Sequence, residues 1–175
     1  MDQIIVGMAD CRISKTTGQV LSAYALGSCI GLSVYDPRAM VGGLLHYMLP
    51  DSTIDAGRAC DRPYMFADTG IPKLLDEVCG HGALRRRLVA HAVGGAQMIN
   101  DAMTFDIGKR NGLALRKVLW KFGVLLAGEV LGGGSSRTMR LEIGSGRVWL
   151  IEQGTEKQLA PAVGMKGAMA WPTGS

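Results

Sequence analysis

The sequence predicts a single α/β domain in which several short β-strands accompany two α-helices. Its 175 residues are enough for one sizeable core and few for two. Hydrophobic residues make up 47% of the chain and charged residues 19%, a balance typical of globular proteins and not of disordered segments. Many of the 25 glycines lie inside apolar runs, which indicates tight turns and close approaches between backbone segments.

The first third of the chain has the pattern of β-strands. Residues 4–14 predict a strand that enters a loop, and residues 20–28 predict a second strand that ends in a Gly-Ser turn. Small or polar residues alternate with apolar ones from Cys29 to Tyr35 and again from Met40 to Tyr47, as in half-buried strands. Asp36-Pro37-Arg38-Ala39 between them is typical of a type I turn, so the two strands form a hairpin.

Two helices are predicted in the remainder of the chain. After an expected surface loop over residues 48–70, residues 71–80 predict a helix that stops at Gly80. The clearest helix spans residues 106–123, with Asp106 as its cap and Gly123 at its end. Its apolar stripe consists of Ala114, Leu115, Val118, Leu119 and Phe122.

The other C-terminal segments predict strands and turns. Residues 86–96 predict a buried strand that runs into a Gly-Gly turn, and residues 97–103 a short helical turn. Residues 124–152 predict strands around a Gly/Ser loop and a Gly-Ser-Gly hairpin turn. No periodicity follows Glu156, so we expect a domain over residues 1–156 and a loose tail over residues 157–175.

Composition excludes several classes of function. The first residues lack the basic start of a secretory signal, and no apolar run reaches the roughly 18 residues of a membrane helix. We therefore expect a cytoplasmic protein with reduced cysteines and no membrane insertion. Aromatic residues make up only 6%, too few for a nucleic-acid surface. The basic run Arg85–Arg87 predicts a solvated loop, which an acidic protein partner could also use.

One cysteine and one histidine meet in the predicted hairpin. If the turn occupies residues 36–39, Tyr35 pairs with Met40, and the ladder places Cys29 directly opposite His46. In this register Ile30, Leu32, Val34, Val41, Leu45 and Tyr47 share a core face. The opposite face carries Cys29, Gly31, Ser33, Gly42, Leu44 and His46, which makes it a floor of small residues with two reactive groups at its open end.

A cysteine beside an imidazole is an activated nucleophile. The imidazole can take the thiol proton, and the thiolate then attacks a carbonyl carbon. The backbone N–H groups of Gly27, Ser28 and Cys29 could stabilise the resulting oxyanion. From spacing alone a second interpretation stays open, in which Cys29 is a small core residue and His46 a hydrogen-bonded core histidine.

A metal site is the other chemistry that these residue types allow. Cys60, Cys79, His81 and His91 would have to assemble, but they lack the paired short spacings of structural zinc sites. We expect neither a metal nor a cofactor, and we interpret His91 as a core residue.

Several segments resemble the CheD family, the chemoreceptor glutamine deamidases of bacterial and archaeal chemotaxis. The similarity starts at "LGSCIGLSVYDP" and "GGLLHYMLP", which contain Cys29 and His46. It continues in order through "FADTGIPKLL", "VGGAQMI", "DIGKRNGLALRKVLWKFGV" and "GEVLGGGSSRTMRLEIGSGRVWL". The segment from the cysteine to the histidine, with Met-Leu-Pro after it, is the most specific of these motifs.

The resemblance implies a cytoplasmic enzyme that converts particular glutamines of chemoreceptors to glutamates and releases ammonia. It implies Cys29 as nucleophile and His46 as base. It also implies a layered sandwich of mixed or antiparallel β-sheets with helices packed on one side, similar to the cytotoxic necrotizing factor toxin domain. Members of the family bind the chemotaxis phosphatase CheC, so a CheC-type partner is expected as well as the receptor.

The chain departs from the family pattern at two positions. Ala23 stands where the family usually has a threonine that orients the histidine, and Ser136 stands where it usually has a glycine. Ser22 is expected on the opposite face of its strand, which leaves Ser33 as a weak substitute. These departures keep an alternative open, a weakly active or non-catalytic chemotaxis regulator that binds a CheC-type phosphatase or a receptor.

Overall fold

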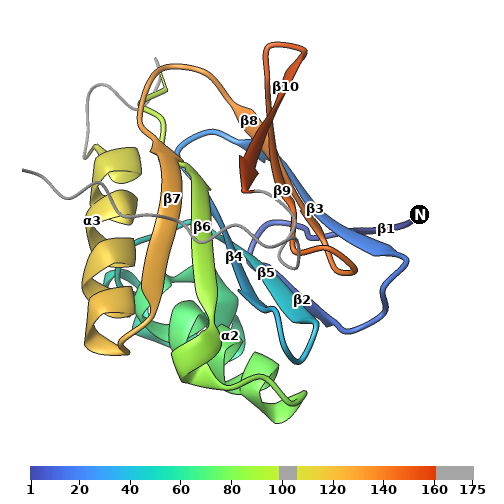
Figure 1. The fold of residues 1–175 in the computed structure, drawn as a ribbon. Helices are drawn as coiled ribbons and strands as arrows, with labels where there is room; N and C mark the ends of the chain where they lie inside the picture. The colour runs from blue at the N-terminus through green and yellow to red at the C-terminus, as the bar shows by residue number, and fades with distance from the viewer. Residues whose placement is uncertain (99–105, 161–175) are drawn as a thin grey trace, which may run out of the picture.

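The computed structural model describes residues 1–98 and 106–160, which fold into three layers (Figure 1). A central five-stranded sheet has helices α2 and α3 on one face and a second five-stranded sheet on the other. The predicted α/β sandwich with helices on one side is therefore confirmed. No helix within the described ranges is long and apolar enough to span a membrane.

The central sheet is mixed, and its strands follow the order β2-β5-β4-β6-β7. All its neighbouring strands are antiparallel except β6 and β7, which are parallel and connected through α3. Their bounds are β2 Asp10–Ser14, β4 Ile30–Asp36, β5 Val41–Tyr47, β6 Val89–Gly94 and β7 Leu125–Leu131.

The outer sheet follows the order β1-β3-β8-β9-β10, and its first pair is parallel. Its remaining neighbours are antiparallel, and the predicted Gly-Ser-Gly turn joins β8 to β9 as a hairpin. Their bounds are β1 Asp2–Ile5, β3 Gln19–Leu26, β8 Arg137–Glu142, β9 Val148–Glu152 and β10 Thr155–Ala160.

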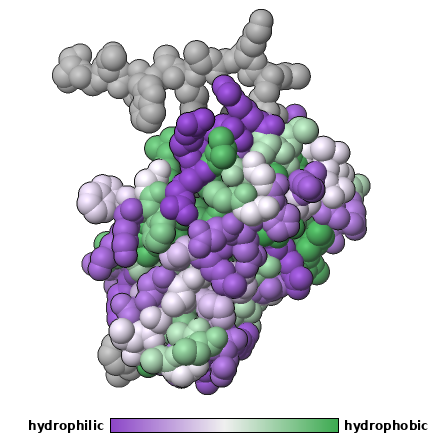
Figure 2. All heavy atoms as spheres, turned by 90° about the horizontal axis from the view of Figure 1, so that it is seen from below, coloured by the Kyte–Doolittle hydropathy of each residue, from purple (hydrophilic) through white to green (hydrophobic). Residues whose placement is uncertain are grey.

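The two longer helices cover the central sheet. Helix α2 (Ala67–Gly80) buries Ile71, Leu74, Leu75 and Val78, and α3 (Ile107–Lys121) buries Leu115, Val118 and Leu119. Helix α1 (Ala56–Asp61) and the 3₁₀ turns Ser52–Ile54, Pro63–Met65 and Arg85–Arg87 lie at the surface. The underside of the molecule is mostly hydrophilic, with hydrophobic residues in small patches (Figure 2).

The core has two parts, one on each face of the central sheet. The helix side contains the face that the sequence predicts, Ile30, Leu32, Val34, Val41, Leu45 and Tyr47. The other side contains Tyr35, Leu44 and Val93 against residues of the outer sheet, with Cys29 packed at its margin. The predicted floor of small residues is therefore not open, because the outer sheet covers it.

Several predicted boundaries are wrong. The first predicted strand is two strands in different sheets, separated by Ala9 in a left-handed conformation (φ 55°). The expected loop over residues 48–70 contains α1, two 3₁₀ turns and the first residues of α2. Residues 157–160, expected in the tail, lie in β10, which pairs with β9. Asp106 precedes α3 but makes no side-chain cap, and the helical turn expected at residues 97–103 falls largely outside the described residues.

The register of the β4–β5 hairpin differs from the predicted one by two residues. Asp36 pairs with Val41, so His46 lies opposite Gly31 and not opposite Cys29. Asp36 stays in the strand because its fully buried carboxylate accepts hydrogen bonds from the Arg38, Ala39 and Leu84 N–H groups. A shift of two residues leaves every side chain on its predicted face.

Arg87 fixes the same carboxylate. Its guanidinium donates to both Asp36 oxygens at 2.7 to 3.0 Å, so the basic run is not simply a solvated loop. Burial alone raises the pKa of the Asp36 carboxyl, but the bonds from Arg87 and three backbone N–H groups outweigh it and lower the pKa to about 2. The pair therefore ties the hairpin turn to the segment before β6.

We predict that Asp36→Asn lowers the free energy of unfolding at neutral pH by about 3 kcal/mol, because it breaks a buried charge-assisted network. The matched control is Asp76→Asn, because Asp76 pairs with Arg85 at an exposed site and should change stability by less than about 0.5 kcal/mol.

Acidification gives the same test a second measurement. The stability that the lowered pKa contributes is complete above the ordinary value of 3.8 and is lost as pH falls toward about 2. Urea titrations across this window should show a smaller loss in Asp36→Asn than in the wild type. Equal losses would contradict the assignment.

Candidate active site

Cys29 lies at the end of the central sheet, one residue before β4. A tight turn precedes it, in which Ala25 is left-handed (φ 55°) and the Gly27 N–H donates to the Ala25 carbonyl at 3.0 Å. On the β6 side, the Ala96 N–H donates to the Gly27 carbonyl and the Gly95 N–H to the Cys29 carbonyl, at 2.8 and 2.9 Å. The backbone of the cysteine is therefore held by hydrogen bonds from the end of the neighbouring strand.

Gly94 allows this close approach. Its φ of 123° favours glycine, and a Cβ atom at this position would lie 2.1 Å from the Cys29 carbonyl oxygen. Any other residue at position 94 would push the cysteine segment away from β6. The predicted Gly-Gly turn is thus a structural part of the site.

His46 lies in β5, directly between Gly31 of β4 and Asp10 of β2. Cys29 precedes Gly31 by two residues and packs on the same side of the sheet, so it is a diagonal neighbour of His46. Diagonal neighbours lie about 7 to 8 Å apart, within reach of a ring side chain. The structure therefore brings the two predicted residues to one corner of the sheet, but not into direct opposition.

Burial keeps the imidazole of His46 neutral. The residue is 2% exposed, and burial lowers its pKa below the usual 6.5, while the Val6 backbone acts in the other direction. The Val6 contact falls short of hydrogen-bond geometry, so neither ring nitrogen has a partner among the described residues. A neutral imidazole with an unoccupied nitrogen can accept a proton from a thiol or a water.

Asn111 of α3 connects the two strands at this corner. Its side-chain amide donates to the carbonyls of Ser28 and Met48, both at 2.9 Å, and the residue is fully buried. Ser28 directly precedes Cys29, and Met48 follows His46 by two positions. The sequence analysis missed this residue. The one signal in the sequence is its spacing: Asn111 precedes Ala114 by three positions and Leu115 by four, which places a polar side chain on the apolar, buried face of the helix.

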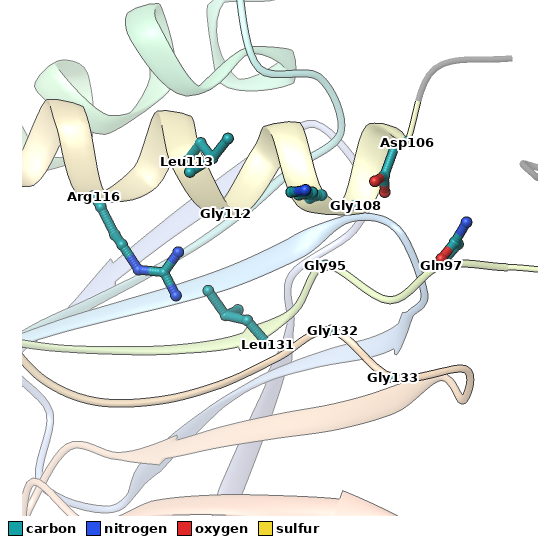
Figure 3. A pocket seen from close by; sticks show the side chains of 11 residues that line it. Gly95, Gln97, Asp106, Gly108, Gly112, Leu113, Arg116, Leu131, Gly132 and Gly133 are labelled. Atoms are coloured by element: carbon teal, nitrogen blue, oxygen red, sulfur yellow. The ribbon is translucent and has the colours of Figure 1, made fainter.

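A groove lies beside the cysteine segment and not around Cys29 itself. Its volume is about 540 Å³, and it lies between α3 and the ends of β6 and β7 (Figure 3). Gly95, Gly108, Gly112, Gly132 and Gly133 line much of it, with Arg116 at one end. Neither Cys29 nor His46 is among its lining residues, although Gly95 binds the Cys29 carbonyl.

The residues considered for a metal site are dispersed. Cys60 is exposed in α1, Cys79 lies in α2 and His81 follows it. Within the described ranges no group of three or more His, Cys, Asp or Glu side chains could hold a metal ion. His91 in β6 is buried, and burial lowers its pKa to about 4, which agrees with its interpretation as a core residue.

Comparison with known proteins agrees with the resemblance. A family model described as "CheD chemotactic sensory transduction" matches residues 48–152. A protein of Solibacter usitatus named "Probable chemoreceptor glutamine deamidase CheD" is 67% identical over 167 residues, which cover 95% of this chain and 99% of that protein. A similarly named protein of Syntrophus aciditrophicus is 46% identical over 154 residues, 88% of this chain and 96% of its own. The chain belongs to the CheD family.

The model of the CheD family begins after both Cys29 and His46, so it does not itself cover the pair. The alignment with the Solibacter protein spans both positions, because it covers 95% of this chain and leaves out only a few residues. At the position where the resemblance implies a threonine, Ala23 is fully buried in β3 and packs in the core between the two sheets. The side chain at this position therefore points into the same interior as His46.

The predicted supporting residues have other contacts. The Gly27 N–H is bound to Ala25, which takes it out of the predicted oxyanion hole in this conformation. The Ser33 hydroxyl donates to the His91 carbonyl at 3.4 Å, and Ser33 lies opposite Leu44. Ser22, as expected, faces away from the interior, where its hydroxyl accepts a hydrogen bond from Gln3. Among the described residues, no acceptor is found for the Ser28 N–H.

We predict that Cys29 is the most reactive of the four thiols at neutral pH. Cys11 is buried, and this burial, together with the charge of Glu77, raises the pKa of its thiol, whereas Cys29 is half-buried with an imidazole nearby. Alkylation with iodoacetamide followed by peptide mass spectrometry gives a rate for each cysteine. His46→Gln should slow Cys29 and leave the exposed Cys60 unchanged. A rate for Cys29 that is no faster than that of Cys60 would contradict the prediction.

Proposed function

We propose that this protein is a chemoreceptor glutamine deamidase that hydrolyses glutamine side-chain amides to glutamate and releases ammonia. The observation that carries the proposal is the placement of Cys29 beside the buried, neutral His46 at one corner of the central sheet. The names of its relatives, which describe probable chemoreceptor glutamine deamidases, indicate the substrate class. As a protein of chemotaxis signalling, it would act in the cytoplasm.

The first half of the proposed reaction forms a thioester. His46 takes the proton of the Cys29 thiol, and the thiolate attacks the carboxamide carbon of the glutamine. The carbonyl oxygen becomes an oxyanion, which accepts a hydrogen bond from the Ser28 N–H. The imidazolium of His46 then gives its proton to the amide nitrogen, the C–N bond breaks, and ammonia leaves.

The second half regenerates the enzyme. His46, neutral again, removes a proton from a water molecule, whose oxygen attacks the thioester carbon. The C–S bond breaks as the tetrahedral intermediate collapses, and the proton on His46 returns to the Cys29 sulfur. The product is a glutamate side chain, so each turnover consumes one water and releases one ammonia.

The proposal includes two protein partners. Chemoreceptors supply the glutamine substrate, as the names of the relatives suggest. A CheC-type phosphatase is the second partner that the family resemblance implies. The net charge of +4 suits an acidic surface on either of them.

A second candidate function is a weakly active or non-catalytic regulator that binds a CheC-type phosphatase or a receptor. The observation in its favour is His46, whose ring nitrogens have no partner among the described residues, together with Ala23 in place of a hydroxyl-bearing residue. An unoriented imidazole spends less time in the geometry that proton transfer needs. A flat reactivity ranking of the four thiols would favour this candidate.

The first prediction from the proposal concerns the nucleophile. The protein is incubated with the cytoplasmic part of a chemoreceptor, and the receptor peptides are then analysed by mass spectrometry. Specific peptides should gain the mass difference between a side-chain amide and a carboxylic acid. Cys29→Ala should abolish the change, because no thiolate remains to form the thioester. Cys60→Ala is the matched control and should keep full activity. Equal modification by the wild type and Cys29→Ala would end the proposal.

The second prediction concerns position 23. Threonine and valine have nearly the same shape, but only threonine can donate a hydroxyl hydrogen bond or accept one. We therefore expect Ala23→Thr to deamidate receptor peptides at least about 10-fold faster than Ala23→Val, the difference that one orienting hydrogen bond can supply. Both variants add the same volume to the core, so any cost of packing cancels in their ratio. Equal kcat values for the two variants would show that position 23 does not orient His46.

A further inference from the structure

We propose that Asn111 is a positioning residue that holds Cys29 and His46 in their reactive arrangement by binding the backbone of both strands at once. The inference rests on the proposed function and adds to it a residue that touches neither the substrate nor the reacting atoms. It is carried by three hydrogen bonds, one buried and two partly buried, that converge on this one side of α3.

The β4–β5 ladder ends immediately before the site. Its last pair is Ile30 with Tyr47, and beyond this pair the two strands bind different neighbours. The Cys29 carbonyl accepts from Gly95 at the end of β6, whereas the Met48 N–H donates to the Met65 carbonyl at 2.9 Å. The cysteine therefore lies where the hairpin has no further ladder hydrogen bonds to set the distance between its strands.

Asn111 supplies the missing connection from the helix side. A side-chain amide has two N–H donors, and here one amide group binds the Ser28 carbonyl and the Met48 carbonyl, both at 2.9 Å. These carbonyls belong to the residue before Cys29 and to the second residue after His46. Because each N–H direction is fixed by the planar amide, the group sets the spacing of the two backbones as a ladder bond would.

The position of the amide is itself fixed. The Tyr47 hydroxyl donates to the Asn111 backbone carbonyl at 2.8 Å, and both residues are fully buried. Burial, with a smaller contribution from Cys29, raises the pKa of Tyr47 well above its usual value, so the hydroxyl stays protonated and remains a donor. Tyr47 directly follows His46, so α3 binds the strand of the histidine at two consecutive residues.

A role in packing alone does not account for this side chain. Its neighbours Leu115 and Val118 on the buried side of α3 are apolar, and a polar group in such a place costs stability unless it is fully hydrogen-bonded. The Asn111 Oδ1 atom is buried without a partner among the described residues, so the cost is not fully offset. The two N–H groups, which do have partners, are therefore the part that serves the site.

The test compares Asn111→Leu with Tyr35→Phe. The first variant removes both bonds to the strand backbones and keeps a side chain of similar size. The second removes a buried hydrogen bond elsewhere in the core, from the Tyr35 hydroxyl to the Ile143 carbonyl, and leaves the amide and its contacts in place. We expect Asn111→Leu to lower kcat for receptor deamidation by about 10²-fold, the cost of misplacing reacting groups by about 1 Å. KM should stay within about threefold, because the amide does not touch the substrate. Tyr35→Phe should lose less than about fivefold in kcat.

A second measurement does not depend on activity. The iodoacetamide rate of Cys29, divided by that of Cys60 in the same sample, should fall in Asn111→Leu and change little in Tyr35→Phe. If the wild type does not modify receptor peptides, the proposed function fails, and this ratio still tests the role of Asn111. Wild-type kcat and a wild-type ratio in Asn111→Leu would overturn the inference and leave the function intact.

Equal losses of kcat in Asn111→Leu and Tyr35→Phe would also overturn it, because they would indicate a general effect of losing a buried hydrogen bond and not the loss of a positioning contact. All rates are measured below the unfolding transition of each variant, followed by circular dichroism. If Asn111→Leu does not fold, Asn111→Ser replaces it, because the serine side chain is too short to bind both carbonyls. It is assessed by the same two measurements, kcat relative to the wild type and the rate of Cys29 alkylation relative to that of Cys60.

Discussion

The register of the β4–β5 hairpin is the constraint on which the site depends. Both strands are buried along their whole length, so the alternation of polar and apolar side chains that fixes register in half-exposed sheets is weak here. Polar anchors at the two ends take its place. Asp36, bound by Arg87, fixes the turn, and Asn111 binds both backbones where the strands separate. Between these anchors, Gly31, His46 and Asp10 pair in one row across the three strands.

Covering the pair with a second sheet determines its electrostatics. In a half-open sheet, water would solvate the imidazole and leave its pKa near the ordinary value. Between two sheets, burial favours the neutral ring, which is the form that can accept a proton from Cys29. The same burial makes each hydrogen bond to the ring contribute more stabilisation, because water cannot replace a missing partner there. The layering of the fold thus favours the neutral ring of His46, whose nitrogens have no hydrogen-bond partner among the described residues.

The sequence was sufficient for the faces of the strands and helices, because these depend on local periodicity, whereas the layered arrangement was implied by the resemblance to the CheD family. The stripe of Leu115 and Val118 and the two faces of the hairpin follow from patterns within a few residues of each other. The register did not follow from the sequence, because the interaction that sets it links Asp36 to Arg87, 51 positions away along the chain. Asn111 was missed for the same reason, since its partners Ser28 and Met48 are 83 and 63 positions distant. Ala9 separates β1 from β2 in a left-handed conformation that alanine rarely adopts, so no turn signal announced it.

In the predicted register, Cys29 and His46 were directly opposed, so the strand ladder alone would have brought them together. In the observed register they are diagonal neighbours, so other parts of the fold must help to hold them in place. A directly opposed pair needs only the sheet, since ladder bonds on both sides fix it. In the observed diagonal arrangement the ladders fix only His46, which pairs with Gly31 and Asp10, whereas Cys29 lies past the last pair and needs restraints of its own. Gly94 and Gly95 provide them from β6, and Asn111 adds one from α3 through the Ser28 carbonyl. The reactive corner is therefore assembled by β6 and α3 together, the two elements that the parallel β6-α3-β7 crossover brings to the same end of the sheet.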